Sequence, residues 1–281
     1  LLRAFIFFFY SELSQIHTWN QEFVASSLQG KRYEAIAGEI ERALRFMRAC
    51  GIDLISEQTL HQVDFWTSHE ALILGWEEAM TRQDSLSGLW YDTSAHLLWV
   101  GERTRQVGSA HLDFLSGIAN PIGAKIGPRA TADEVVALCD TLDPGREPGR
   151  LTLVARMGSE KVTTVLPALL SAVRSSGHPV IWQCDPMHGN TVVGPGGRKT
   201  RHFDAVLTEI KAFFEVCRAA DVWPGGVHVE LTGDDVTECL GGAEEILADQ
   251  LSLRYTTTCD PRLNGRQSLD LAFQVAELLR Q

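Results

Sequence analysis

Short apolar runs alternate with amphipathic stretches along most of this chain. The runs lie at residues 63–66, 96–100, 122–126, 151–155, 180–183 and 227–231. Between and after them, apolar positions repeat at helical spacing over residues 133–142, 161–175, 203–219 and 267–279. Near-continuous apolar runs are typical of parallel strands buried on both faces, and repeated βα units predict a parallel sheet with right-handed crossovers. The pattern therefore predicts an α/β fold with six strands, two fewer than a closed (β/α)8 barrel contains.

Residues 1–50 follow a different pattern, which predicts two helices. Residues 2–9 place apolar side chains on one helical face, and after Gln29 and Gly30 a second apolar repeat runs from Tyr33 to Met47. The run 5–9 is apolar all round, so we expect it to be buried against a partner. Because no linker or low-complexity segment divides the chain, we expect one domain over residues 1–281, with a helical lead-in at 1–50 and βα repeats over 51–281.

Composition and charge narrow the class of partner. The 281 residues carry a formal net charge of −11, which argues against nucleic acid or an anionic membrane surface as a partner. Six cysteines are scattered without a C-x-x-C pair, so we expect reduced thiols in a cytoplasmic protein. The apolar run 4–10 is too short to span a bilayer and lacks the features of a signal peptide. Because the chain begins with Leu1, we expect it to be a processed or excised piece, or one that lacks upstream residues.

The run that begins at Val180 ends abruptly in polar residues that suit a functional site. Asp185, Pro186 and His188 follow the apolar residues directly, and reactive groups in parallel sheets lie just past the carboxyl ends of strands. The alternative is a Pro/Gly turn with a hydrogen-bonded histidine. Donors also follow two later segments, at Glu230 and Asp260. One imidazole and two carboxylates form a ligand set for Mn, Fe, Co or Zn with positions left open for substrate, although a satisfied ion pair would use the same residues.

A second set of residues is cationic: Arg103, Arg105, Lys125 and Arg156. Lys125 and Arg156 sit within or beside apolar runs, where an unpaired charge is costly, so each needs an anionic partner. That partner is either a structural carboxylate or a phosphorylated, carboxylate-bearing substrate. The Gly-rich residues 194–199 lie next to the same site, as either a loop that covers the substrate or an ordinary surface loop.

Several segments, in order along the chain, resemble the class II (plant and actinobacterial type) 3-deoxy-D-arabino-heptulosonate 7-phosphate (DAHP) synthases. They are residues 64–70 (DFWTSHE), 91–96 (YDTSAH), 99–106 (WVGERTRQ), 118–123 (IANPIG), 148–153 (PGRLTL), 184–190 (CDPMHGN), 236–242 (VTECLGG) and 259–264 (CDPRLN). The resemblance implies a metal-dependent (β/α)8 barrel that condenses phosphoenolpyruvate with erythrose 4-phosphate, the first step of the shikimate pathway.

The same resemblance implies roles for individual residues. His188, Glu230 and Asp260 match three metal ligands, and the expected cofactor is a divalent ion: Mn, Co or Zn. The residues that match the phosphoenolpyruvate-binding set are Glu102, Arg103, Lys125 and Arg156. Of all these residues, Lys125, Glu102 and His188 are the expected catalytic groups.

The chain also departs from the family pattern. The segments that match the family's first two barrel strands, including a cysteine ligand and a Gly-Gln-Tyr/Phe-Ala-Lys-Pro-Arg stretch, do not occur in the sequence. We therefore expect an N-terminally truncated, partial barrel that forms a homo-oligomer or is completed by another chain, with residues 5–9 as an interface. Cys184 or Cys259 either replaces the missing thiolate or is an ordinary thiol. The alternative functions are another carbon–carbon bond reaction in secondary metabolism and a non-catalytic partner subunit.

Overall fold

The computed structural model describes residues 28–52 and 66–280 of the chain. The chain divides into two compact units, residues 1–65 and 66–281, each of which is treated by itself. In the first unit, helix α3 (Leu28–Ala49) confirms the second of the two helices predicted for residues 1–50. The helix already includes Gln29 and Gly30, so these residues do not separate two helices as expected. The predicted helix at 2–9 and residues 63–65 lie outside the described residues.

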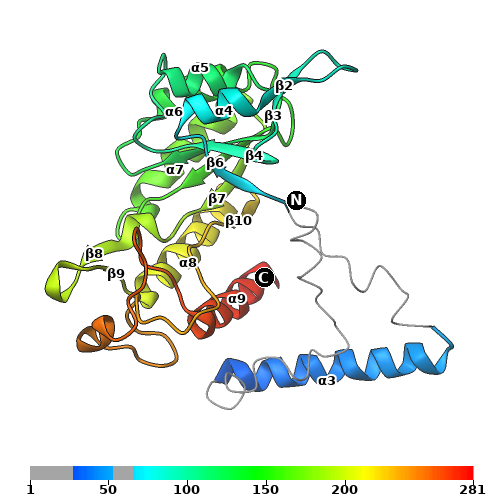
Figure 1. Cartoon of the computed structure of the whole chain (residues 1–281), viewed down its shortest axis with the longest axis vertical. Helices are drawn as coiled ribbons and strands as arrows, with labels where there is room; N and C mark the ends of the chain where they lie inside the picture. Colours follow the sequence, from blue (N-terminus) through cyan, green and yellow to red (C-terminus); the bar gives the residue numbers. More distant parts are fainter. Residues whose placement is uncertain (1–27, 53–65, 281) are drawn as a thin grey trace. The chain divides into compact units, whose positions relative to one another are not determined.

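The second unit is built around a six-stranded sheet. Its strands, in spatial order, are β1 (Ser68–Glu70), β4 (Leu97–Val100), β5 (Ile122–Ile126), β6 (Leu151–Ala155), β7 (Ile181–Cys184) and β10 (Pro224–Val227). Every neighbouring pair is parallel, and the spatial order follows the order along the chain. This arrangement confirms the predicted α/β class with six parallel strands. Figure 1 shows the sheet with helices packed beside it.

Two of the predicted strands are displaced along the sequence. Sheet pairing begins at Ser68, whereas the prediction placed the first strand at 63–66, of which the structure describes only Trp66, outside any strand. The last strand ends at Val227 instead of beginning there, so Glu230 lies beyond the strand. The register of β10 on β7 shifts between Pro224 and Val227, and at Gly225 between them a Cβ would lie 2.6 Å from Ile181 Cγ2. Only glycine lets β10 pair so closely with β7.

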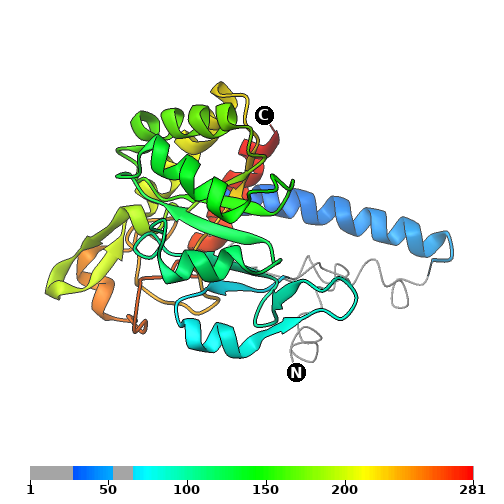
Figure 2. The same ribbon diagram turned by 90° about the horizontal axis from the view of Figure 1, so that it is seen from above.

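Helices cover the sheet and lie side by side in sequence order. They are α5 (Ala110–Ser116), α6 (Ala132–Leu142), α7 (Val162–Ser176), α8 (Phe203–Ala219) and α9 (Gly265–Arg280), with α4 (Leu74–Met80) near the start of the unit. Consecutive members of the row from α5 to α9 contact one another (Figures 1 and 2). Alternate strand residues, such as Ile122, Ala124 and Ile126, join buried helix residues in one continuous core.

The opposite face of the sheet is more polar and strongly curved. Lys125 belongs to this face, because Ala124 and Ile126 on either side of it lie in the helix-covered core. The rings of Trp99 on β4 and His228 after β10 meet edge to face, with their centroids 5.2 Å apart. Three strands separate β4 from β10 in the sheet, so this contact requires the sheet to curl as the wall of a barrel does. The expected partial barrel is confirmed.

Two antiparallel hairpins extend from this framework. One joins β2 (Thr81–Gln83) to β3 (Trp90–Asp92), and the other joins β8 (Thr191–Val193) to β9 (Lys199–Arg201). The β8–β9 hairpin protrudes at one side in both ribbon views (Figures 1 and 2), and its tip contains the short helix η4 (Pro195–Gly197). This tip packs on helix η5 (Ala248–Ser252). The Gly-rich residues 194–199 therefore have a defined support beside the carboxyl ends of the strands.

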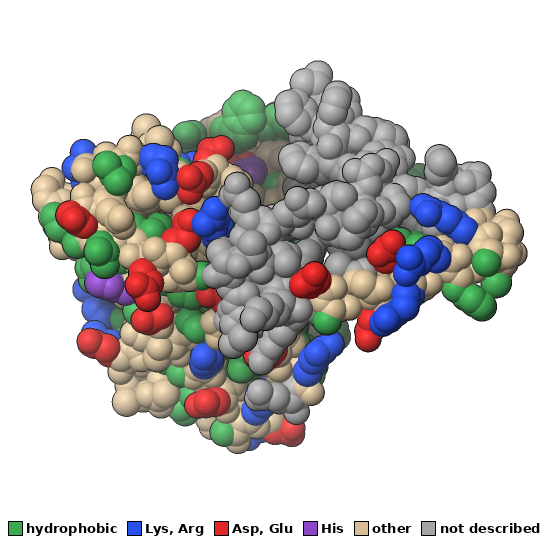
Figure 3. All heavy atoms as spheres, turned by 90° about the horizontal axis from the view of Figure 1, so that it is seen from below, with side chains coloured by type: hydrophobic (Ala, Val, Ile, Leu, Met, Phe, Trp, Pro, Cys, Tyr) green, Lys and Arg blue, Asp and Glu red, His purple; other side chains and the backbone are tan. Residues whose placement is uncertain are grey.

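The surface carries charges of both signs. On the face shown in Figure 3, acidic and basic side chains are interspersed over the second unit. All six cysteines are free. Within residues 28–52 and 66–280, every helix is too short or too polar to cross a membrane.

Replacing Phe213 by alanine should destabilise the second unit through its apolar core alone. Phe213 is fully buried on α8 and packs edge to face on Phe214, so truncation leaves a cavity between helix and sheet. We expect the free energy of unfolding in urea to fall by about 3–5 kcal/mol. The matched control is Trp223→Ala, because Trp223 is 74% exposed and its truncation should change stability by less than about 1 kcal/mol. Equal losses in the two variants would contradict the assigned packing of α8.

Candidate metal and anion site

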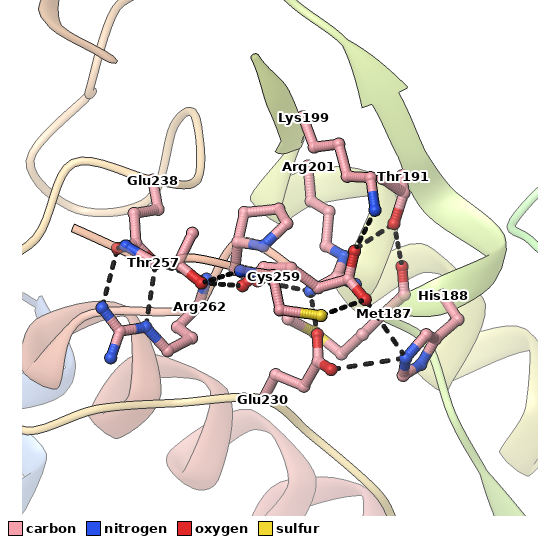
Figure 4. A network of polar contacts seen from close by, with 12 residues as sticks. Met187, His188, Thr191, Lys199, Arg201, Glu230, Glu238, Thr257, Cys259 and Arg262 are labelled. Carbon is pink, nitrogen blue, oxygen red and sulfur yellow. Dashed lines mark hydrogen bonds and ion pairs between the residues drawn. The ribbon is translucent and has the colours of Figure 1, made fainter. Parts of the chain in front are cut away.

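The structure brings His188, Glu230 and Asp260 together. Each contributes a donor atom to a group whose members lie within 4.8 Å of one another. His188 Nε2 lies 3.3 Å from Glu230 Oε1 and 4.0 Å from Asp260 Oδ2. Figure 4 shows the imidazole and the Glu230 carboxylate directed toward each other. The three side chains therefore leave a space that one cation could share, as the pattern of strand ends predicted.

Two of the three side chains follow strand ends, and the third lies in a loop that joins them. β7 delivers the chain to Asp185, and the 3-10 helix η3 (His188–Asn190) begins three residues later. Glu230 lies three residues beyond β10. Asp260 lies in the segment before α9, which is bridged to the residues after β10 through Leu231 and Leu263. Adjacent parallel strands place their carboxyl ends at one edge of the sheet, and this common edge makes the convergence possible.

Asp185 fixes the orientation of His188. Its side chain is fully buried, and Oδ2 accepts hydrogen bonds from His188 Nδ1 at 2.7 Å and from Lys125 Nζ at 2.5 Å. Oδ1 accepts from the backbone N–H groups of Met187 and His188. Because Nδ1 is engaged in this way, Nε2 is the nitrogen that faces the two carboxylates. Histidines that bind metals are commonly oriented by a carboxylate in this manner.

The electrostatics of the cluster favour a positive charge at its centre. Burial disfavours the imidazolium, but hydrogen bonds to Asp185 and Glu230 outweigh burial and raise the pKa of His188 to about 9. Burial also opposes ionisation of Asp185, yet the bond from His188 and the charge of Lys125 hold the pKa of that carboxyl well below its usual range. Three carboxylates thus lie around one imidazole, and each is also paired with a cationic side chain: Lys125 with Asp185, Arg201 with Glu230 and Lys199 with Asp260.

Arg201 orients Glu230. The Arg201 side chain is fully buried, and its Nη1 donates to Glu230 Oε2 and to the Pro261 carbonyl. Nε donates to Thr191 Oγ1 at 3.0 Å. With Oε2 held in this way, Oε1 is the Glu230 oxygen that faces His188. Burial raises the pKa of Glu230, but the hydrogen bond with His188 and the Arg201 charge reverse the effect and lower it overall.

The segment that carries Asp260 is held by Glu238, another buried carboxylate. Glu238 accepts two side-chain hydrogen bonds from Arg262, at 2.8 and 3.0 Å, and further bonds from the backbone N–H groups of Thr256 and Thr257. Lys199 of β9 donates to Asp260 Oδ1 at 2.8 Å. Figure 4 shows these groups as one connected network around the cluster. Asp260 is therefore positioned on both sides, by the loop and by the hairpin.

Neither cysteine proposed as a replacement thiolate belongs to the cluster. Cys184 is fully buried in the core between sheet and helices, and burial raises the pKa of its thiol well above the ordinary value. Cys259 is exposed, and its Sγ lies 3.8 Å from Asp260 Oδ2. Within the part of the chain that the structure describes, only His188, Glu230 and Asp260 form a group with metal-ligand spacing.

The residues predicted to bind phosphoenolpyruvate do not all lie in one cleft. A cleft of about 620 Å³ adjoins the cluster, with His188, Glu102 and Arg156 in its lining. Lys125 is buried and pairs with Asp185, so a structural carboxylate is its partner. Arg103, in contrast, is exposed and absent from the described lining of the cleft.

Glu102 is held firmly at the edge of this cleft. Arg105 donates to both of its carboxylate oxygens at 3.0 Å, and the backbone N–H of Gly127 donates to Oε2 at 2.6 Å. The cleft lining also contains Arg129 and Lys161, which the sequence patterns above did not single out. Both follow closely on the ends of β5 and β6, and this position was the signal that could have identified them.

The fold and the site together define a class of protein. A curved, parallel α/β sheet carries an imidazole, two carboxylates and a cation-lined cleft at the carboxyl ends of its strands, as barrel-type α/β proteins with a metal and an anion site do. A family model described as the class-II DAHP synthetase family matches residues 1–276. The chain therefore belongs to the class-II DAHP synthetase family.

Curated relatives agree with this assignment. The phospho-2-dehydro-3-deoxyheptonate aldolase of Streptomyces coelicolor is 56% identical over 280 residues, which cover 100% of this chain and 62% of that protein. The phospho-2-dehydro-3-deoxyheptonate aldolase AroG of Mycolicibacterium smegmatis is 53% identical over 286 residues, covering 100% of this chain and 61% of that protein. The chain thus spans about three fifths of the length of these relatives.

A solved structure also aligns with the chain, but weakly. It is a truncated form of 3-deoxy-D-arabino-heptulosonate 7-phosphate synthase from Thermotoga maritima, with 19% sequence identity and a TM-score of 0.37. The alignment covers 66% of this chain and 58% of that one. A TM-score of this size does not bear on the fold, which rests on the strand pairing described above.

Replacing Asp185 by asparagine should destabilise the protein at neutral pH, because Lys125 would remain buried without its counter-charge. We expect a loss of about 3–5 kcal/mol in the free energy of unfolding at pH 7, measured in urea. The folded pKa of Asp185 lies below the unfolded value of about 3.9. The contribution is therefore complete above that pH and is lost as the pH falls through the folded value. Asp221→Asn, an exposed control, should behave like wild type; an equally stable Asp185→Asn variant would contradict this account.

Replacing Arg201 by lysine should weaken metal binding while the protein stays folded. Lysine lacks the planar fork that contacts Glu230, Pro261 and Thr191 together, so the Glu230 carboxylate would lose its fixed orientation. We expect the affinity for Mn²⁺, followed by electron paramagnetic resonance, to fall by about 10- to 100-fold. Arg198→Lys on the same hairpin is the control, since the Arg198 guanidinium stacks on the Tyr255 ring and is not paired with Glu230. Unchanged Mn²⁺ affinity in Arg201→Lys would exclude this role.

Proposed function

We propose that this chain carries the metal- and enolpyruvate-binding face of a DAHP synthase, an enzyme that condenses phosphoenolpyruvate with erythrose 4-phosphate. Family membership and the names of the two relatives support this proposal. The observation that carries it is the convergence of His188, Glu230 and Asp260 within 4.8 Å, beside a cleft lined by Arg156. The reaction would be the first step of the shikimate pathway.

The donor set fits a divalent metal. One imidazole nitrogen and two carboxylate oxygens suit Mn, Co or Zn and leave coordination positions open for a substrate carbonyl. When bound, such an ion would polarise the aldehyde carbonyl of erythrose 4-phosphate. The buried partners Asp185 and Arg201 support this assignment, because they hold His188 and Glu230 in single orientations before any ion arrives.

The cleft suits an anionic substrate. Arg156, Arg129 and Lys161 line it, and arginine forks bind phosphate and carboxylate oxygens in bidentate fashion. Lys125 lies behind the cluster with Asp185, and its pKa is lowered because burial outweighs the attraction of that carboxylate. We propose Lys125, Glu102 and His188 as catalytic groups, and Arg156 with Lys125 and Glu102 as the set that binds phosphoenolpyruvate. The Arg103 side chain is exposed, so only the family motif supports its assignment to the phosphoenolpyruvate-binding set.

In the proposed reaction, C3 of phosphoenolpyruvate forms a bond to the aldehyde carbon of erythrose 4-phosphate. A water molecule adds to C2 of the enolpyruvyl group, and the phosphate then leaves as its C2–O bond breaks. Cationic side chains around the cleft would stabilise the departing phosphate, and a protonated group near the aldehyde would neutralise the developing alkoxide. The reaction would therefore need positive charge at two places, a metal ion near the aldehyde and arginines near the phosphate, and the cluster and the cleft could provide them.

The two ends of the sheet suggest how the protein would assemble. Among the described strands, β1 and β10 each pair on one side only. Exposed strand edges favour pairing with another chain, so we propose a homo-oligomer or completion of the barrel by another chain. A cytoplasmic location fits the free thiols.

The test mixes the purified protein with phosphoenolpyruvate, erythrose 4-phosphate and Mn²⁺ or Co²⁺, and follows loss of the enolpyruvyl absorbance. We expect metal-dependent consumption that His188→Ala abolishes and that His111→Ala, a control histidine bonded to the Leu72 carbonyl, retains. Metal uptake without consumption in a folded sample would contradict this reaction and indicate another carbon–carbon bond reaction. A protein that takes up no divalent ion would be a non-catalytic partner subunit.

A further inference from the structure

A buried glutamate lies beneath the cleft without belonging to the metal cluster. Glu209 is on the second turn of α8, among the core residues Val206, Ile210 and Phe213, and its side chain is fully buried. Its hydrogen-bond partners are neutral donors from two separate loops. Burying a carboxylate among neutral groups is costly, and an apolar residue at this core position would avoid that cost.

The two loops follow β6 and β7 directly. Glu209 Oε1 accepts hydrogen bonds from the backbone N–H groups of Met157 at 2.8 Å and Gly158 at 2.9 Å. Glu209 Oε2 accepts from Asn190 Nδ2 at 2.7 Å. One loop carries Arg156, which lines the cleft, and the other carries His188 of the metal cluster. A single carboxylate therefore connects the residues next to both functional side chains.

Asn190 also bonds to the backbone of both loops. Its Oδ1 accepts from the backbone N–H of Ser159 at 3.0 Å, and its Nδ2 also donates to the Pro186 carbonyl at 2.8 Å. The loop backbones touch, because a Cβ on Gly189 would collide with the backbone nitrogen of Gly158. Gly158 itself has φ of +84°, a conformation that favours glycine. The loops are thus locked together by side-chain bonds and by a backbone contact that leaves no room for a side chain.

We propose that Glu209 and Asn190 form a clamp that fixes Arg156 relative to His188. The clamp would hold the anionic substrate bound at Arg156 at a fixed distance from the metal ion bound at His188. Glu209 is a positioning residue in this scheme, because it contacts neither the cleft nor the cluster. The inference rests on the proposed function, since it assigns the two loops to the enolpyruvyl anion and the metal.

The clamp requires a carboxylate at position 209, not merely a polar group. Glutamine could accept the two backbone N–H groups through Oε1, but its Nε2 would then face Asn190 Nδ2, donor against donor. Rotating the Asn190 amide would only move the conflict to the Ser159 N–H. Glu209→Gln combined with Asn190→Asp restores the bond between positions 209 and 190, because the new aspartate would accept from both the glutamine amide and the Ser159 N–H, although it loses the bond to the Pro186 carbonyl.

Burial of Glu209 carries an electrostatic cost. Burial raises the pKa of its carboxyl to about 7, against the opposing effect of the hydrogen bonds from Gly158 and Met157. A residue that served only to fill space would avoid this cost as glutamine or leucine. The geometry of the loops gives the carboxylate a role that neither replacement could perform.

The test measures how Mn²⁺ and phosphoenolpyruvate influence each other's binding, by calorimetric titration of each ligand with and without the other. In the wild-type protein we expect Mn²⁺ to raise the affinity for phosphoenolpyruvate by about tenfold or more. Glu209→Gln should remove most of this coupling while each ligand alone still binds, and Glu209→Gln/Asn190→Asp should restore it. Glu215→Gln, an exposed glutamate on the same helix, is the matched control and should keep full coupling.

Amide hydrogen exchange provides a second readout that does not depend on ligands. The N–H groups of Met157 and Gly158 should exchange slowly in wild type and faster in Glu209→Leu, which removes their acceptor, at a temperature where both proteins are folded. Full coupling in Glu209→Gln, or equal protection of these amides in wild type and Glu209→Leu, would overturn the clamp. If the wild-type protein bound neither ligand, the proposed function would fail instead, and the positioning role would fall with it.

Discussion

The buried carboxylate of Asp185 is the constraint on which the rest of the site depends. It accepts hydrogen bonds from Lys125, from the imidazole of His188 and from two backbone N–H groups, at the point where β7 ends. Because all four donors converge on one residue without solvent exposure, the end of the strand and the His188 ring have a single arrangement. The direction of His188 Nε2, and with it the position of any shared cation, follows from this one group.

Further buried charges extend the same principle to the neighbouring segments. Arg201 orients Glu230, Glu238 holds the segment that carries Asp260, and Glu209 joins the loops after β6 and β7. Each lies outside the reacting groups and acts through a side chain that does face the cleft or the cluster. The sheet brings the strand ends to one edge, and these buried groups convert that approximate proximity into defined distances. Supporting residues of this kind are a general requirement for precise metal and anion sites.

The strands and helices could be predicted from repeating patterns in the sequence. Residues whose role depends on a partner far along the chain could not. Strands at 122–126 and 151–155 were predicted because burial on both faces leaves continuous apolar runs, and the approach of Glu230 to His188 followed from strand order, whereas Asp260 comes from a loop before α9. The last strand was misplaced because its pairing depends on the close approach of Gly225 to Ile181, which no periodicity shows. Arg201 and Glu209 were missed because they bond to residues 29 and 52 positions away, and nothing local marks either side chain as buried.

The central claim is that His188, Glu230 and Asp260 hold one cation at the mouth of the sheet. Anomalous scattering from crystals soaked in Mn²⁺ tests it most directly, because the peak locates the ion independently of any activity. The account predicts a single strong peak within about 2.0–2.4 Å of His188 Nε2 and of an oxygen from each carboxylate. A peak elsewhere, or none at full soak with the three side chains in place, would contradict it.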